Sequence, residues 1–198
     1  MMNNQKGTAG IKVIFFIVIL GMASLMVAAK IQQRQQVNIM MSQIASLGAT
    51  VSKQSANASE IIGKYNRNYA RYLYETGKLP SGLSYTDNAI RAANNAIIKA
   101  NVDANGVVVM EVANLNANSC VKMATANWGD LRTTQFAGIG IGKAPDFGCL
   151  VSNSCKFNYI AAFSGTSDYP FSEERASIPC SLFEKANEPA TVYLGYKL

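Results

Sequence analysis

An uncharged, apolar run near the N-terminus constrains this chain more than any other feature. Seventeen residues without a charge, Val13 to Ala29, lie between Lys12 and Lys30. As a helix they would extend about 26 Å, which is close to the thickness of the hydrocarbon core of a bilayer. A buried helix in a small soluble domain does not need to be this apolar on all sides. The run therefore predicts a segment that is embedded in a membrane.

Three kinds of segment contain such a run. A cleaved secretory signal would end at the small residues Val27 to Ala29, and a simple single-pass anchor would end with the run itself. In this chain, apolar residues continue at spacings of three to seven from Ile31 to Val51, as on one face of an amphipathic helix. We therefore favour the third kind, a helix that begins in the membrane and continues into an extracytoplasmic domain. The signal and the anchor remain the alternatives.

The charges separate the N-terminal segment from the rest of the chain. Residues 1–59 contain five cations and no acid, whereas residues 60–198 contain 13 cations and 12 anions. Five of the six net positive charges thus come from the N-terminal segment, and nucleic-acid binding, which needs a concentrated basic face, is not predicted. The absence of His excludes Ser-His-Asp and Cys-His catalysis and His-ligated metals. We predict no catalytic residue, no cofactor and no metal, and hence no enzyme.

The helical pattern continues with gaps through three tyrosines, Tyr65, Tyr69 and Tyr72, and stops at Lys78 to Gly82. We interpret these tyrosines as an aromatic face that packs on a sheet with its hydroxyl groups in water; a ligand-stacking platform is the alternative. Further helices are predicted from residues that favour helix N-termini. They run from Thr86–Asn88 to Ile97 or Ile98, from Asn118 or Ser119 to Asn127, and onward from Ser172 through Glu173 and Glu174.

Strand signals alternate with these short helices. The turn Asp103 to Gly106 separates two apolar runs and predicts a hairpin. Later strands are predicted at Phe136 to Ile141, Phe157 to Phe163 and Thr191 to Tyr196. Strands mixed with short helices after one long helix predict an α+β domain.

Glycines suggest two kinds of local structure. The run Gly138 to Lys143 superficially matches a phosphate-binding loop, but Ala137 and Ala144 stand where that motif needs Gly and Ser or Thr. We interpret its glycines as positions where a strand packs closely against a neighbour. Gly48 and Gly63, together with the polar run Ser52 to Ser59, are expected to kink or fray the helical pattern in which they lie.

The first seven residues, Met-Met-Asn-Asn-Gln-Lys-Gly, form a short, polar, basic leader that ends in Gly7 ahead of the apolar run. This order resembles the leader of type IV prepilins, which prepilin peptidase cleaves after a glycine. The resemblance implies cleavage between Gly7 and Thr8 and N-methylation of Thr8. The helix would stay in the membrane first and later pack against its copies in a filament. The predicted assembly residues are Ile14, Phe15, Phe16, Ile17, Val18, Ile19, Leu20, Leu25, Met26 and Val27.

Later segments narrow the resemblance. The run Cys120 to Thr125, followed by Trp128-Gly129, looks like the Cys-led helix of type IVb pilins, the class of bundle-forming and conjugative thin pili. Ala176 to Cys180 and then Ala190 to Tyr193 resemble the closing Cys, polar loop and last strand of that family. The resemblance implies a long N-terminal helix packed on an antiparallel β-sheet with short helices, and a disulfide-bonded C-terminal region.

Four cysteines outside the apolar run of an exported chain suggest two disulfides, for which three pairings exist. The family pattern implies that Cys120 pairs with Cys180, which leaves Cys149 and Cys155 for a small local loop. A metal site made of all four cysteines is the rival interpretation, but the chain has no CxxC spacing to support it.

One residue departs from the family pattern. Pilins usually carry Glu at the fifth mature position, where it pairs with the N-terminal amine of a neighbour, and this chain has Lys12 there. Two cations repel, so Lys12 does not make that pair. The departure indicates an atypical or minor pilin, or a cleavage point elsewhere. Cleavage after Gly10 would place Phe15 at the fifth position and does not restore the pattern.

The resemblance as a whole implies a structural subunit of a type IVb pilus, with a leader (1–7), a membrane and filament-core helix (8–51) and an extracytoplasmic head (52–198). The expected partners are further copies in a helical filament, prepilin peptidase, the inner-membrane assembly machinery and the membrane itself. The subunit would move from the inner membrane to an extracellular pilus that serves adhesion, aggregation or conjugative contact. The alternative is a membrane-anchored or secreted disulfide-bonded binding module that does not polymerise, with its mature N-terminus at Met1 or near Lys30.

Overall fold

A computed structural model of the 198-residue chain describes residues 5–53, 58–129, 134–143, 161–164 and 166–198, and for residues 5–26 it describes the backbone alone. The chain forms two compact units, Met1–Asn38 and Ile39–Leu198. From here on, the head means the second unit, which starts before residue 52, where the head was predicted to begin. We describe each unit by itself.

Helix α1 (Gln5–Lys53) begins in the first unit, and its residues from Ile39 onward belong to the head. In the first unit, Val27 and Ile31 are exposed. Among the side chains that the structure describes, no helix combines the length and the apolar character that crossing a membrane requires. Most of the predicted membrane segment, residues 13–26, lies outside those described side chains.

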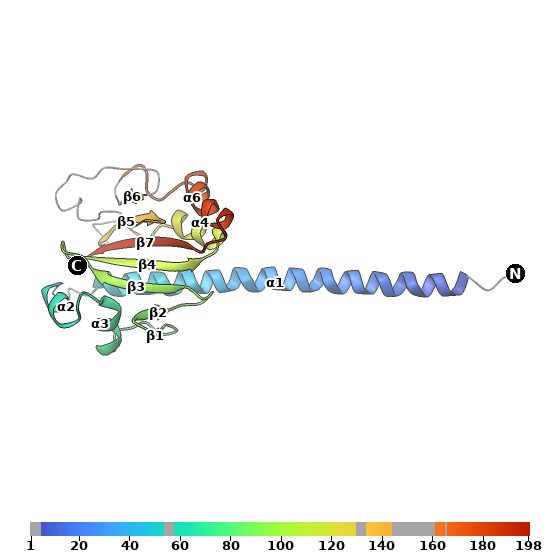
Figure 1. Cartoon of the computed structure of the whole chain (residues 1–198), viewed down its shortest axis with the longest axis horizontal. Coiled ribbons are helices and arrows are strands. Elements are labelled where there is room, and N and C mark those ends of the chain that lie inside the picture. Colours follow the sequence, from blue (N-terminus) through green and yellow to red (C-terminus); the bar gives the residue numbers. More distant parts are fainter. Residues whose placement is uncertain (1–4, 54–57, 130–133, 144–160, 165) are drawn as a thin grey trace. The chain divides into compact units, whose positions relative to one another are not determined.

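The head is built on one antiparallel sheet of seven strands in the order β1-β2-β3-β4-β7-β5-β6 (Figure 1). Strand β7 lies between β4 and β5, so the strand that comes last along the chain joins the two parts of the sheet. The strands are β1 (Ser84–Thr86), β2 (Ala89–Arg91), β3 (Ile97–Val102), β4 (Val107–Leu115), β5 (Phe136–Ile141), β6 (Ala161–Phe163) and β7 (Ala190–Lys197).

Four short helices accompany this sheet. Helices α2 (Ala58–Lys64) and α3 (Tyr69–Glu75) contact β3, and α3 also contacts β1 and β2. Helices α4 (Ala117–Thr125) and α6 (Glu173–Lys185) pack on each other and on β5 and β7 (Figure 1). The predicted α+β class with an antiparallel sheet is therefore confirmed.

The part of α1 in the head buries one face. Met40, Ile44, Leu47 and Val51 are fully buried, and their spacing of three or four residues places them on one side of the helix, as predicted. Helix α1 continues through Gly48, so the expectation that Gly48 frays it is wrong. A Cβ atom at position 48 would lie 2.7 Å from Cζ of Tyr196 on β7. Gly48 thus allows the tyrosine ring of the sheet to approach the helix backbone.

The helix predicted from Thr86 to Ile97 or Ile98 is wrong, because this segment forms strands β1, β2 and the start of β3. Asp87 and Asn88 both have left-handed backbone conformations (φ 53° and 59°), and Thr86 pairs with Ala89 across them. This is the geometry of a two-residue hairpin turn. Asp and Asn favour helix N-termini and left-handed turns alike, so their presence did not distinguish the two structures.

Other predicted elements agree more closely. Asp103 to Gly106 forms the turn of the β3–β4 hairpin, and β5 has the predicted bounds. Strand β7 is one residue longer at each end than predicted, and β6 matches the last part of the predicted strand, whose residues 157–160 lie outside the described residues. Helix α6 follows Ser172 as predicted, whereas α4 is capped by Asn116, ahead of the predicted Asn118 or Ser119.

Candidate functional site

One predicted disulfide is present in the head. Cys120 on α4 and Cys180 on α6 are bonded, with their Cα atoms 5.8 Å apart, and both residues are fully buried. The bond joins two helices that lie 60 residues apart in the sequence, so it closes the part of the head that contains β5 and β6. Cys149 and Cys155 lie outside the described residues.

The residues predicted for processing and assembly lie in α1. Gly7 and Thr8, the predicted cleavage and methylation sites, fall in its first turns. Their side chains, and those of the predicted assembly residues from Ile14 to Met26, lie outside the described side chains, whereas Val27 is 59% exposed. The candidate site is therefore sought among the described side chains of the head.

The three tyrosines Tyr65, Tyr69 and Tyr72 pack in the head, and the hydroxyl group of Tyr69 is buried there. Tyr65, Tyr69 and Tyr72 are buried, and the rings of Tyr65 and Tyr69 each lie 5.4 Å from that of Tyr72. Lys78 Nζ donates to the hydroxyl of Tyr72 (3.0 Å). The hydroxyl of Tyr69 is buried and has no hydrogen-bond partner among the described residues, so the prediction that it reaches water is wrong. Burial, together with the nearby Tyr72, raises the pKa of Tyr69 well above its usual value.

Two patches expose apolar side chains beside different halves of the sheet. Beside β1, Tyr74 on α3 is 56% exposed and stacks on Tyr85, with ring centroids 4.9 Å apart; we call this pair the tyrosine patch. Beside β5 and β7, Ile178 and Leu182 on α6 are 57% and 55% exposed, and we call them the α6 patch. Because they are four residues apart, they lie on the same side of α6.

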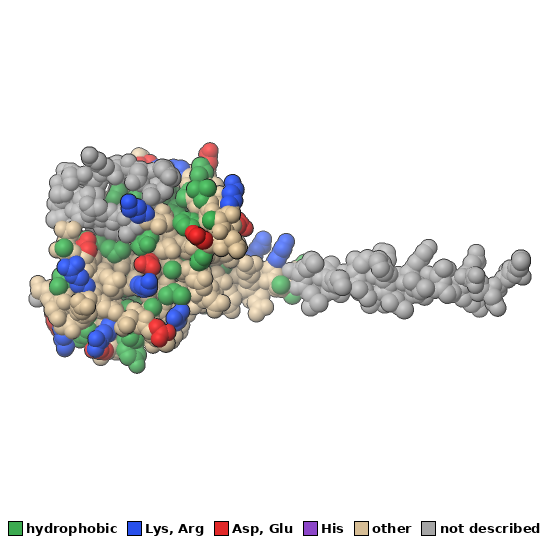
Figure 2. All heavy atoms as spheres, viewed as in Figure 1, with side chains coloured by type: hydrophobic (Ala, Val, Ile, Leu, Met, Phe, Trp, Pro, Cys, Tyr) green, Lys and Arg blue, Asp and Glu red, His purple; other side chains and the backbone are tan. Residues whose placement is uncertain are grey.

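The two patches have surroundings of opposite charge. Residues 60–91, around the tyrosine patch, contain five cations and three anions, whereas residues 166–190, around the α6 patch, contain five anions and two cations. Figure 2 shows Lys and Arg side chains mixed with Asp and Glu side chains on the α2–α3 side, and hydrophobic side chains over α6. Some charges are paired locally, as in Arg71–Glu75 (2.6 Å) and Asp168–Arg175 (2.5 Å). Glu173 and Glu174 are exposed in the first turn of α6.

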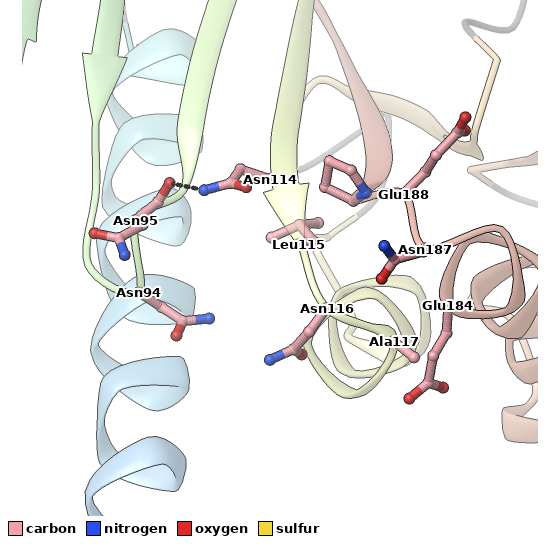
Figure 3. Close-up of a pocket in the computed structure, with 10 residues that line it drawn as sticks. Asn94, Asn95, Asn114, Leu115, Asn116, Ala117, Glu184, Asn187 and Glu188 are labelled. Carbon is pink, nitrogen blue, oxygen red and sulfur yellow. Dashed lines mark hydrogen bonds between the residues drawn. The ribbon is translucent and has the colours of Figure 1, made fainter.

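A cleft of about 410 Å³ opens where the β2–β3 turn, the end of β4, the start of α4 and the α6–β7 turn meet. Amide side chains dominate its lining (Figure 3). Five asparagines line it together with Glu184 and Glu188; the asparagines are Asn94, Asn95, Asn114, Asn116 and Asn187. We call it the asparagine cleft. The sequence reasoning missed it, because no single stretch of the chain contains its lining.

Local backbone conformation explains why asparagines gather there. Asn94, Asn95, Asn114 and Asn187 all have a left-handed backbone, with φ between 56° and 64°. Asparagine adopts this conformation more readily than most residues other than glycine. The β4–β7 register shifts between Val112 and Leu115, so Asn114 lies at a bulge, and its amide donates to the carbonyl oxygen of Asn95 (2.8 Å).

Metal and phosphate sites gain no support from the described part of the head. Among its residues, no group of three or more His, Cys, Asp or Glu side chains is placed to bind a metal ion. In the glycine run, a Cβ atom at Gly138 would lie 2.7 Å from the carbonyl oxygen of Ala162 on β6. This supports the interpretation of Gly138 as a residue of close strand packing.

Comparisons with protein-family models, with curated proteins and with solved structures found no match to this chain.

Proposed function

We propose that this chain is a structural subunit of a type IVb pilus, processed by prepilin peptidase after Gly7 and polymerised through its N-terminal helix. The observation that carries the proposal is the order of segments: a basic leader, a 17-residue run without a charge, and a disulfide-bonded α+β head. An apolar helix of this kind is stable in lipid or against its own copies, and pilus assembly uses both environments. Its function would be structural, with no catalytic step.

The two patches of the head support an assembly that repeats in one direction. A filament needs a heterologous contact, in which two different surfaces of the same chain fit each other. The tyrosine patch with its basic surroundings and the α6 patch with its acidic surroundings are complementary in this sense. Because one patch lies beside β1 and the other beside β5 and β7, the contact between one pair of heads leaves one patch of each head free for the next. Opposite charges around the patches would set the direction of the contact.

Lys12 bears on the place of the subunit in the filament. The pair between an acid and the N-terminal amine of a neighbour would be missing, which motivates a variant of the proposal in which the chain is a minor or tip subunit. Immunogold labelling of sheared filaments tests this point. Label along the whole filament would exclude the minor or tip variant, and label confined to tips or sparse sites would support it.

The first experiment is the intact mass of the protein from sheared filaments. We expect a chain that begins at Thr8 and carries one N-methyl group. A chain that retains Met1 to Gly7, or that is absent from filaments, contradicts the proposal. A mature N-terminus at Met1 or near Lys30 would instead favour the non-polymerising binding module.

The second experiment exchanges charges around the patches. Glu173→Lys with Glu174→Lys should reduce filament yield, as should Lys64→Glu with Arg67→Glu, which changes two exposed cations outside the Arg71–Glu75 ion pair. All four changes in one chain should restore part of the yield, because the attraction between the two patches is reversed but kept. The matched control is Lys99→Glu with Glu111→Lys, which inverts an exposed ion pair between β3 and β4 (3.5 Å), away from both patches. Equal loss in this control would show that the charge changes act through folding.

A further inference from the structure

We infer that the asparagine cleft binds a neutral polyhydroxylated ligand, such as the end of an oligosaccharide. Its volume of about 410 Å³ suits one or two sugar rings, since small-molecule sites commonly measure about 300–1,000 Å³. This goes beyond the proposed function, because it concerns recognition by a single head and does not require a filament.

The orientation of the amides supports a convergent site. Asn94 and Asn116 point toward one another from opposite sides of the cleft, and Asn187 points into it from the α6–β7 turn (Figure 3). Ser119 holds the first two in place: its hydroxyl accepts from Asn94 Nδ2 (3.1 Å), and its backbone N–H donates to Asn116 Oδ1 (2.8 Å). Ser119 itself is fully buried. Two of the amides are therefore positioned before any ligand arrives.

Unused hydrogen-bonding groups remain in the cleft. Within the described chain, the side chain of Asn187 makes no hydrogen bond, and each of Asn94 and Asn116 uses only one of its polar atoms. An amide presents a donor and an acceptor side by side, and a sugar hydroxyl is both donor and acceptor. Neighbouring hydroxyl groups on a ring would thus match amides that converge from separate elements.

The remaining lining argues against other ligand classes. No Lys or Arg lines the cleft, and the carboxylates of Glu184 and Glu188 disfavour a phosphate or an acidic sugar. These two carboxylates point away from each other, so they do not form a cation site (Figure 3). Leu115 is 1% exposed, so Ala117 and Pro189 are the apolar lining residues that a ligand can reach.

The test is saturation-transfer NMR on the full chain, held in a detergent without a sugar headgroup. The probes are maltotriose, tri-N-acetylchitotriose and, as an acidic sugar, sialyllactose. We expect saturation transfer to at least one of the two neutral trisaccharides, and weaker transfer to sialyllactose. No transfer to either neutral trisaccharide, or stronger transfer to sialyllactose, would overturn the inference.

Two variants locate the binding without disturbing the fold. Asn187→Gly keeps the left-handed backbone and removes the amide, and Asn116→Ser keeps a good helix N-cap with a shorter side chain. Each should lower the affinity for the neutral probe about threefold to tenfold, the effect of one lost hydrogen bond. The matched control is Asn66→Gly, also at a left-handed position (φ 49°) but outside the cleft. Unchanged affinity in both cleft variants, or an equal loss in the control, contradicts the assignment.

Discussion

The two ends of the sheet are stabilised in different ways. At the end that contains β5 and β6, a buried disulfide joins α4 to α6. At the end that contains β1 and β2, polar contacts with α1 replace a covalent bond: Gln43 Nε2 donates to the carbonyl oxygen of Gly82 (2.6 Å), and Gln43 Oε1 accepts from the N–H of Ala93 (2.8 Å). The disulfide keeps α4 and α6 together even when noncovalent contacts between them open. The contact of α1 with the other end loses stability with each Gln43 hydrogen bond that is removed.

Removal of the disulfide should have the largest effect. The double variant Cys120→Ala with Cys180→Ala should lower the free energy of unfolding by about 4 kcal/mol, the chain-entropy value for a loop of this length. Urea unfolding followed by circular dichroism measures the loss. Hydrogen exchange should show α4 and α6 opening first while β1–β3 stay protected. Equal loss of protection at both ends would contradict a difference between them and show that the head unfolds as one unit.

The centre of the sheet provides the next test. Gly48→Ala should destabilise the head by about 1–3 kcal/mol, because the new methyl group meets the Tyr196 ring. The matched control is Gly63→Ala in α2, where a Cβ atom meets nothing within 4 Å, and it should gain about 0.5–1 kcal/mol from helix propensity. In a double-mutant cycle, Tyr196→Leu should recover part of the loss in Gly48→Ala. Equal effects at the two glycines would contradict the close approach.

Replacing the side chain of Gln43 should destabilise the end of the sheet that contains β1 and β2. Gln43→Met keeps the helix propensity and the size of the residue but removes both hydrogen bonds, so we expect a loss of about 1–2 kcal/mol in thermal or urea unfolding. Increased exchange should be confined to the amides near Gly82 and Ala93. Gln36→Met, at an exposed position of the same helix, serves as the control and should change stability by less than about 0.5 kcal/mol.

A small gain is expected at Tyr69. Tyr69→Phe removes a buried hydroxyl without a partner among the described residues and should stabilise the head by about 1 kcal/mol. The pKa of Tyr69 is raised in the folded head. Titration of this residue therefore leaves the free energy of unfolding unchanged below the unfolded pKa of about 10 and lowers it as the pH rises beyond that value. Unfolding midpoints between pH 8 and 11 should therefore fall less steeply in the variant. An identical alkaline slope in both proteins would assign that loss to other groups, such as Tyr196, whose pKa burial also raises.

Sequence patterns predicted the elements whose signals are local. Ser172 caps α6 and Asp103–Gly106 turns the hairpin because each motif acts within a few residues. The helix predicted to begin at Thr86–Asn88 was wrong because these residue types suit a helix N-cap and a left-handed turn equally. The asparagine cleft combines residues about 90 positions apart, so no local pattern predicted it. The only related signal in the sequence is the presence of asparagines, which favour left-handed turns, in the segments that line it. The disulfide pairing came from the family resemblance, since spacing alone allowed three pairings.

The position of β7 has a consequence for how the head reaches its native state. It inserts between β4 and β5, with Val112 of β4 and Ile141 of β5 both paired to its Val192. Until β7 is in place, β4 and β5 each present an unpaired edge, and the two halves of the sheet share no ladder. Because the chain is synthesised from its N-terminus, both edges would remain open to wrong pairings until this last strand has been made. A chaperone that shields exposed strand edges would be most useful in that interval.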